Sequence, residues 1–388
     1  METFTPPEAH QLVKFFTEFL SFSFPPPSKP QNLPYSLFQI IRAYTPPALI
    51  KDVSGISGSG GAEDLGKIYT SQSRGSHTSK IETNSYSYTL GESTIGIDFL
   101  GRVSNGSYGV LYDVNRNGVE GRFYLKTGSK SLKHEAFLQQ AAYYVLKAYG
   151  LPWAVPRVYD IVSHPHYGVC FTMDAVVPAL MFGTHLMRQI QWTRACRAND
   201  VLVFEIVAQI AIYILLLENV LGLNHRDLKL NNVLMVKEEP LINAPVRCSP
   251  YLRASINASV RAVLIDFGFA CIGDLEQSRF LLSADDFLPA AVDMCPKVGR
   301  DMFLIFANLW NVRALRKALT PGASLLFKRW LTDVKGKDWA LWLSSDIDKE
   351  LIQTYNLVNN ASFQAPWAKP IGVLTDIAHA YPEILKMD

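Results

Sequence analysis

The chain has 388 residues, of which 48% are hydrophobic and 19% are charged. This length and composition suit a globular protein with a sizeable core, built either as one two-lobed domain with a tail or as two domains. The formal net charge is only +2. The charge therefore excludes an electrostatic case for binding to nucleic acid or to an anionic membrane.

The first 90 residues are predicted to form an N-terminal extension. They contain two short apolar helix candidates, 9–20 and 35–44, with proline-rich connections between them. Residues 53–80 are rich in Gly and Ser, which predicts that this stretch is disordered. We expect a domain boundary near residue 85.

Residues 91–176 are expected to form a small strand-rich lobe. A helix is predicted from about Ser131 to Tyr149, because the stop signal Gly150-Leu-Pro152 follows it. The remaining segments are short and rich in β-branched and aromatic residues, which predicts strands. These strands are 95–103, 109–114, 122–126, 155–162 and 168–173.

Residues 177–388 are expected to form a larger, mainly helical lobe, with helices at 199–221, 299–318, 323–331 and 347–358. The segment Val201–Leu223 is long and apolar enough to span a bilayer. It carries Glu205, Gln209 and Glu218, however, so we predict a buried core helix instead. A small β-rich lobe joined to a helical lobe is an α+β architecture, and a cleft is expected between the two lobes.

Five cysteines are scattered along the chain, and none forms a CxxC pair. An odd number without paired spacing argues against a disulfide framework and against a zinc site, and it favours a reducing compartment. The apolar run 15–24 is not preceded by a basic start, so no signal peptide is expected. We therefore predict an intracellular protein of the cytoplasm or the nucleus that has no membrane partner.

Two motifs predict phosphoryl transfer. The run His225-Arg-Asp-Leu-Lys-Leu-Asn-Asn232 forms one short loop, and Asp266-Phe-Gly268 follows an apolar strand candidate. Asp227 is expected to orient and deprotonate the substrate hydroxyl, while Lys229 neutralises charge on the phosphoryl group. Asn232 and Asp266 are expected to hold Mg²⁺, a hard cation that prefers oxygen ligands. His225 and Phe267 are expected to be packing residues.

Three further elements would hold the nucleotide. Lys126 ends a predicted strand and would pair with the phosphates of ATP. Glu135 is the only acidic residue between Lys126 and Tyr149, so it is assigned by elimination as the partner of that lysine. The turn Ser104-Asn-Gly106-Ser-Tyr-Gly109 would let backbone N–H groups approach phosphates, although an ordinary hairpin turn has the same composition.

These motifs resemble those of the eukaryotic-type protein kinases over about residues 95–310. The resemblance implies a two-lobed, protein-kinase-like fold that uses ATP and Mg²⁺, with the residue roles given above. It also implies that Met173 is the gatekeeper and that backbone groups of Asp174 and Val176 bond the adenine. Lys229 is similar to the Ser/Thr-specific branch of the family, so the resemblance implies Ser or Thr hydroxyls of proteins as substrates.

The chain departs from the family pattern at several places. No Ala-Pro-Glu follows Asp266-Phe-Gly268, and Ser104 stands where a first glycine is expected. The interval from Asn232 to Asp266 is longer than is typical, which predicts a surface insertion around 237–260. Asp301 could be the residue that braces the catalytic loop.

Three functions therefore stay open. The first is an active Ser/Thr protein kinase, which the complete set of motif residues favours. The second is a small-molecule kinase on the same fold, which the missing Ala-Pro-Glu favours. The third is a nucleotide-binding pseudokinase scaffold, whose support is the altered glycine-rich turn.

Overall fold

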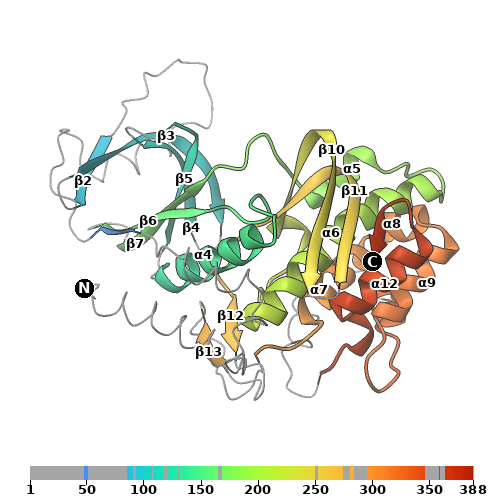
Figure 1. Ribbon diagram of the computed structural model, residues 1–388. Coiled ribbons are helices and arrows are strands. Elements are labelled where there is room, and N and C mark those ends of the chain that lie inside the picture. The colour runs from blue at the N-terminus through green and yellow to red at the C-terminus, as the bar shows by residue number, and fades with distance from the viewer. Residues whose placement is uncertain are drawn as a thin grey trace. The chain divides into compact units, whose positions relative to one another are not determined.

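The structure is a computed structural model (Figure 1), and it describes residues 48–50, 85–90, 93–106, 109–116, 120–128, 132–164, 168–249, 252–273, 280–283, 295–345, 358 and 363–387. The helices predicted at 9–20 and 35–44, the Gly/Ser-rich stretch 53–80 and most of the helix predicted at 347–358 lie outside these residues. The described chain divides into two compact units. Unit 1 comprises 48–137 and 157–175, and unit 2 comprises 138–156 and 176–387.

Unit 1 is built on a seven-stranded sheet with the order β1-β6-β7-β5-β4-β3-β2. The strands are β1 Ala48–Ile50, β2 Ser85–Leu90, β3 Ser93–Gly106, β4 Gly109–Arg116, β5 Phe123–Gly128, β6 Val158–His164 and β7 Gly168–Asp174. The five predicted strands correspond to β3 to β7. The outer strands β1 and β2 come from the segment that the sequence analysis placed in the N-terminal extension. Neighbouring strands are antiparallel, except that β1 runs parallel to β6.

Strand β5 shows why this sheet has two different faces. Phe123, Leu125 and Thr127 are buried, whereas Tyr124 and Lys126 are only partly buried. This alternation is the period of two that a half-buried strand requires. One face of β5 therefore enters the hydrophobic core of unit 1, and Lys126 lies on the other face.

Helix α4 (Lys133–Ala148) follows β5 and confirms the predicted helix. The other helices belong to unit 2. They are α5 Phe182–Gln189, α6 Arg197–Leu221, α7 Arg300–Asn311, α8 Arg313–Ala318, α9 Pro321–Trp330, α10 Trp339–Ser345 and α12 Pro370–Ala380, with the 3₁₀ turns η2 Leu230–Asn232 and η3 Pro366–Ala368. The sequence patterns did not predict α5, α10 or α12.

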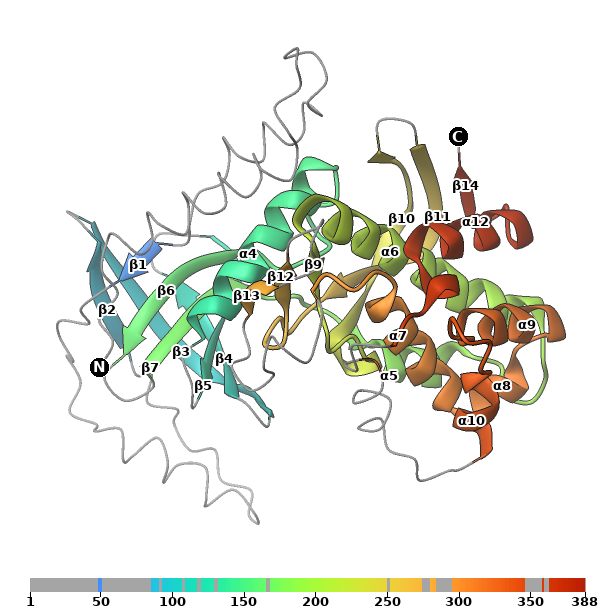
Figure 2. The same ribbon diagram turned by 90° about the horizontal axis from the view of Figure 1, so that it is seen from below.

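Helix α6 is long and apolar enough to cross a membrane, but most of its side chains are buried inside unit 2, as predicted. It packs against α12 and against the β10–β11 hairpin (Figure 2). The helix ends at Gly222, where φ is 58° and the glycine N–H caps the carbonyls of Leu217 and Glu218. This left-handed residue turns the chain sharply into the loop that begins at His225.

Two sheets in unit 2 flank that loop. The first, β14-β11-β10-β8, is formed by β8 Leu180–Met181, β10 Val233–Ser249, β11 Leu252–Leu264 and β14 Leu385–Met387. The second, β13-β12-β9, is formed by β9 Leu223–Asn224, β12 Cys271–Gly273 and β13 Phe280–Ser283.

The prediction that residues around 237–260 form a surface insertion is wrong for 254–260, which lie in β11. These residues extend the β10–β11 hairpin (Figure 1), and strand β14 pairs with residues 254–256 of β11. Ala254, Ile256 and Ala258 are buried. Residues 254–260 of β11 therefore belong to the core of unit 2, because alternate side chains of this stretch are buried.

Candidate active site

Asp227, Lys229 and Asn232 lie together in unit 2, as the loop motif predicted. Lys229 Nζ lies 2.7 Å from Asp227 Oδ2. Asn232 Nδ2 donates to the backbone carbonyl of Asp227 and to Oδ2, both at 2.9 Å. Within the described chain both of these side-chain contacts fall on Oδ2 of Asp227 and neither involves Oδ1. These contacts orient the carboxylate of Asp227.

Asn232 and Asp266 project from the same end of the β10–β11 ladder. Val233 pairs with Leu264 as the last rung, and Ile265 N–H donates to the Asn232 carbonyl at 3.1 Å. The side-chain N–H₂ of Asn232 donates to Asp227. The side-chain oxygen of Asn232, Oδ1, is therefore the atom of this residue that could bind a metal. Asp266 has a φ of 67°, an uncommon conformation that costs about 1–3 kcal/mol and is typical of functional sites.

The donor set fits Mg²⁺ better than it fits zinc. In the described part of the chain, no group of three or more His, Cys, Asp or Glu side chains could hold a metal ion. Asn232 and Asp266 would supply two hard oxygen ligands. A Mg²⁺ ion bound there would take its remaining ligands from phosphate and water, as this ion commonly does.

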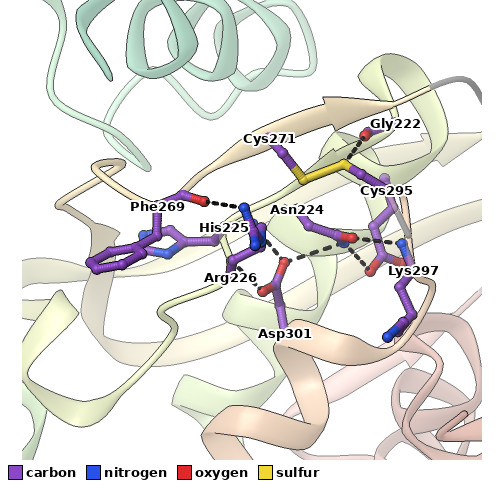
Figure 3. Close-up of a disulfide and its surroundings, with 10 residues drawn as sticks. Gly222, Asn224, His225, Arg226, Phe269, Cys271, Cys295, Lys297 and Asp301 are labelled. Atoms are coloured by element: carbon purple, nitrogen blue, oxygen red, sulfur yellow. Dashed lines mark hydrogen bonds between the residues drawn. A yellow bond between two sulfur atoms is a disulfide. The ribbon is translucent and has the colours of Figure 1, made fainter. Parts of the chain in front are cut away.

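Asp301 on α7 supports the loop from below (Figure 3). Its carboxylate is fully buried, and it accepts the backbone N–H of His225 at 2.7 Å and that of Arg226 at 2.8 Å. Arg226 has a φ of 66°, and its guanidinium donates to the Phe269 carbonyl at 3.3 Å. Asp301 therefore holds the loop backbone directly before Asp227.

His225 is a packing and hydrogen-bonding residue in this arrangement. Its Nε2 lies 3.0 Å from the Ile265 carbonyl oxygen, and its ring lies 4.8 Å from that of Phe267. Because a carbonyl can only accept, Nε2 carries the proton and the ring is held as a donor. His225 thus connects the loop to the strand end that carries Asp266.

Lys126 and Glu135 form an ion pair inside unit 1. Lys126 Nζ lies 2.5 Å from Glu135 Oε1, and the two side chains are 16% and 5% exposed. Lys126 comes from β5 and Glu135 from the first turn of α4, so the nine-residue spacing is bridged by a tight connection. A partly buried ammonium held in this way is suited to a phosphate contact.

The turn between β3 and β4 places Ser104 opposite Leu111, and Gly106 opposite Gly109. A β-carbon on Gly109 would lie 2.1 Å from the Thr127 carbonyl oxygen. Gly109 is therefore required by the close approach of β4 to β5, whatever else this turn does. The phosphate contact of Ser104, Gly106 and Gly109 stays a prediction.

The predicted adenine contacts lie at the end of β7. Met173 pairs with Tyr124 of β5, so it lies on the same sheet face as Lys126. The N–H of Asp174 donates to the Arg157 carbonyl at 3.0 Å, and its carboxylate accepts the Tyr159 hydroxyl at 2.7 Å. A base could therefore use only the backbone carbonyl of Asp174. Val176 is the first residue of the last segment of unit 2, and its role stays a prediction.

Two supporting residues were missed by the sequence analysis. Asn224 Oδ1 accepts the N–H of Lys297 at 2.6 Å, and Asn224 Nδ2 donates to Glu218 Oε1 at 3.2 Å. The same oxygen of Glu218 accepts the N–H of Gly299 at 3.2 Å. Burial, followed by the charge of Asp301, raises the pKa of Glu218 well above its ordinary value. An isolated Asn or Glu carries no sequence signal for such a role.

Cys271 and Cys295 form a disulfide, although the scattered cysteines argued against a disulfide framework (Figure 3). The two cysteines are 24 residues apart in the sequence. They lack the close spacing that marks a cysteine motif, so the pair becomes visible only when the fold brings β12 against the segment before α7.

The sequence matches no protein-family model and no curated protein. Among solved structures the chain is similar to the BubR1 kinase domain, with 12% identity, a TM-score of 0.35, 70% of this chain covered and 61% of that one. The chain thus spans less than two thirds of the BubR1 chain. It is also similar to vaccinia related kinase 3, with 13% identity, a TM-score of 0.40 and coverage of 74% and 88%.

A third similar structure is the Mycobacterium tuberculosis PknI kinase domain, with 18% identity, a TM-score of 0.31 and coverage of 44% and 58%. The observed architecture is the α+β arrangement that the motifs implied. It combines a sheet-rich unit carrying the Lys126–Glu135 pair with a helix-rich unit carrying the Asp227 loop. All three of these solved structures are described as kinases or kinase domains.

Proposed function

We propose that this protein is an ATP- and Mg²⁺-dependent protein kinase that transfers the γ-phosphate to Ser or Thr hydroxyls of protein substrates. The observation that carries the proposal is the fixed carboxylate of Asp227, held through Oδ2 by Lys229 and Asn232. Phosphoryl transfer asks a protein mainly for positioning and for positive charge near the phosphates. In this loop the positioned group is the Asp227 carboxylate, and the positive charge is that of Lys229.

The proposed chemistry assigns one task to each polar group. Oδ1 of Asp227 accepts the proton of the substrate hydroxyl as its oxygen attacks the γ-phosphorus. The Lys229 ammonium offsets the negative charge that develops on the transferred group. Bound Mg²⁺ would neutralise charge on the phosphates, and the oxygens of Asn232 and Asp266 would hold it.

The nucleotide is proposed to contact unit 1 through Lys126, with Glu135 holding its ammonium in place. The turn at Ser104, Gly106 and Gly109, the gatekeeper Met173 and the backbone of Asp174 and Val176 complete the proposed nucleotide contacts. The proposal includes an intracellular location and protein partners, with neither nucleic acid nor membrane as a partner.

The test is transfer of labelled γ-phosphate from Mg-ATP to a mixed protein extract and to the chain itself. Asp227→Asn is expected to lower the rate about 10²- to 10⁴-fold, the usual share of a general base. Asp338→Asn is the matched control, because Asp338 only caps the backbone N–H of Leu341 on the surface. Full activity of Asp227→Asn would refute the assigned role.

A small-molecule kinase is the second candidate, because no Ala-Pro-Glu follows Asp266-Phe-Gly268. Asp227-dependent ATP consumption with metabolites but not with proteins would establish it. Stabilisation by Mg-ATP in a thermal-shift assay, without transfer to any acceptor, would instead indicate a nucleotide-binding scaffold.

A further inference from the structure

The Cys271–Cys295 disulfide joins the two chain segments that lead to and from the candidate active site. Cys271 opens β12, five residues after Asp266 along the sequence, and Cys295 precedes Asp301 by six residues. Both cysteines are fully buried. The bond therefore connects the segment after Asp266, a proposed metal ligand, to the segment before Asp301, whose carboxylate holds the loop backbone (Figure 3).

Both cysteines are also held in place by contacts that do not depend on the bond. Cys271 pairs with Asn224 in the β12–β9 ladder, and Gly273 N–H donates to the Gly222 carbonyl at 3.0 Å. On the other side, the N–H of Lys297 donates to Asn224 Oδ1 at 2.6 Å. The short stem Gly222–Asn224 thus anchors the backbone on both sides of the disulfide.

Gly273 shows how closely the two segments approach each other. A β-carbon at this position would lie 1.7 Å from the Cys295 carbonyl oxygen. Because backbone lies directly against backbone, the two cysteines meet at short range whether or not their sulfur atoms are bonded. The pair is therefore preorganised for oxidation, and its reduction removes one connection among several.

The same stem leads directly into the catalytic loop. Asn224 is followed by His225 and Arg226, whose backbone N–H groups are held by Asp301. A shift of the Cys295 segment would move Asp301, and a shift of β12 would move the chain after Asp266. Displacements of about 1 Å at such positions can change a rate by about 10²-fold.

We propose that Cys271 and Cys295 form a reversible thiol–disulfide element that positions the catalytic loop, so that the oxidised protein transfers phosphate faster than the reduced one. This inference rests on the proposed function. Reduction by a dithiol breaks the S–S bond through a mixed disulfide. Two electrons and two protons pass to Cys271 and Cys295, which become thiols, and the dithiol becomes a cyclic disulfide.

Of the remaining cysteines that the structure describes, Cys170 and Cys196 are free thiols. Burial raises the pKa of Cys170 to about 12, so its thiol is a poor nucleophile at neutral pH. Both cysteines of the disulfide are fully buried, so reduction by dithiothreitol requires a local opening of the fold and a correspondingly long incubation.

The test uses the full chain purified without reductant. Peptide mapping under non-reducing conditions is expected to find a peptide that links Cys271 to Cys295. Treatment with dithiothreitol is expected to lower kcat about three- to tenfold, since the noncovalent contacts keep most of the loop geometry, and to leave KM for ATP unchanged. The Cys271→Ser/Cys295→Ser double variant should have the kcat of the reduced protein, and dithiothreitol should not change it. The Cys196→Ser variant should respond to dithiothreitol as the wild type does.

Three results would overturn the proposal. These are the absence of the linked peptide, equal kcat values before and after reduction, and a double variant that still responds to dithiothreitol. Hydrogen exchange keeps the test independent of the proposed kinase activity. Reduction should speed amide exchange over residues 222–232 even if no phosphate transfer is ever observed, and unchanged exchange there would refute the positioning role itself.

Discussion

The buried carboxylate of Asp301 holds the backbone of Arg226 in a left-handed conformation. Asp301 Oδ1 accepts the Arg226 N–H at 2.8 Å, and φ of Arg226 is 66°. A non-glycine residue in this region costs about 1–3 kcal/mol, so it persists only where its surroundings compensate. The consequence is that Asp227, the next residue, is presented by a backbone that Asp301 defines.

Asp301→Asn should weaken both folding and catalysis. An amide has one accepting oxygen, so one of the two N–H groups of His225 and Arg226 loses its partner in a buried place. We expect the free energy of unfolding to fall by about 1–3 kcal/mol, and kcat to fall more than KM for ATP rises. Urea unfolding and initial-rate kinetics measure the two effects. A variant with wild-type stability would contradict the buried-carboxylate account.

Asn232→Ala should raise the Mg²⁺ concentration needed for half-maximal activity at least about tenfold. The substitution removes the carbonyl oxygen proposed to bind the ion and also the two hydrogen bonds to Asp227. A Mg²⁺ titration at saturating ATP measures the shift. Asn257→Ala is the control, because Asn257 is exposed on β11 and its side chain makes one long contact with the Glu383 carbonyl. Equal titration curves for both variants would exclude Asn232 as a ligand.

Glu218→Gln should change how stability depends on pH. Burial and the nearby Asp301 raise the pKa of Glu218 in the folded protein above its ordinary value of 4.5, so the folded state keeps a proton that the unfolded state releases. The contribution of Glu218 is therefore fully present below pH 4.5 and declines as pH rises towards the raised pKa, by up to about 1.4 kcal/mol per pH unit.

Glutamine stays neutral at every pH, and its carbonyl oxygen can still accept the Gly299 N–H. The variant should therefore gain stability relative to wild type as pH rises above 4.5. Urea unfolding of both proteins between pH 5 and pH 8 measures the difference. A difference that is constant over this range would mean that Glu218 is ionised in the folded protein.

Gly109→Ala should destabilise the protein whether or not nucleotide binds there. The new β-carbon would lie 2.1 Å from the Thr127 carbonyl oxygen, a backbone atom that cannot rotate away. We expect a loss of about 1–3 kcal/mol, as for other overpacked sites. Gly101→Ala on β3 is the matched control, since a β-carbon there meets nothing within 4 Å. The same midpoint of thermal unfolding for both variants would contradict the close approach of Gly109 to the Thr127 carbonyl.

The sequence by itself determined the motif residues and the elements that carry them. Strand alternation in β5, the long apolar run of α6 and the loop from His225 to Asn232 are local patterns, and each one depends on residues that are near neighbours in the chain. These patterns were enough to predict the α+β architecture and the joint placement of Asp227, Lys229 and Asn232.

Only the tertiary structure decided how the loop is supported. Arg226 and Asp301 are 75 residues apart, Glu218 and Gly299 are 81 apart, and the two cysteines of the disulfide are 24 apart. No periodicity links such positions, because their distance in space depends on how α6, β12 and α7 pack together. Buried polar groups need hydrogen-bond partners. Asn224 and Glu218 supply such partners to Lys297 and Gly299, and neither residue belongs to a sequence motif.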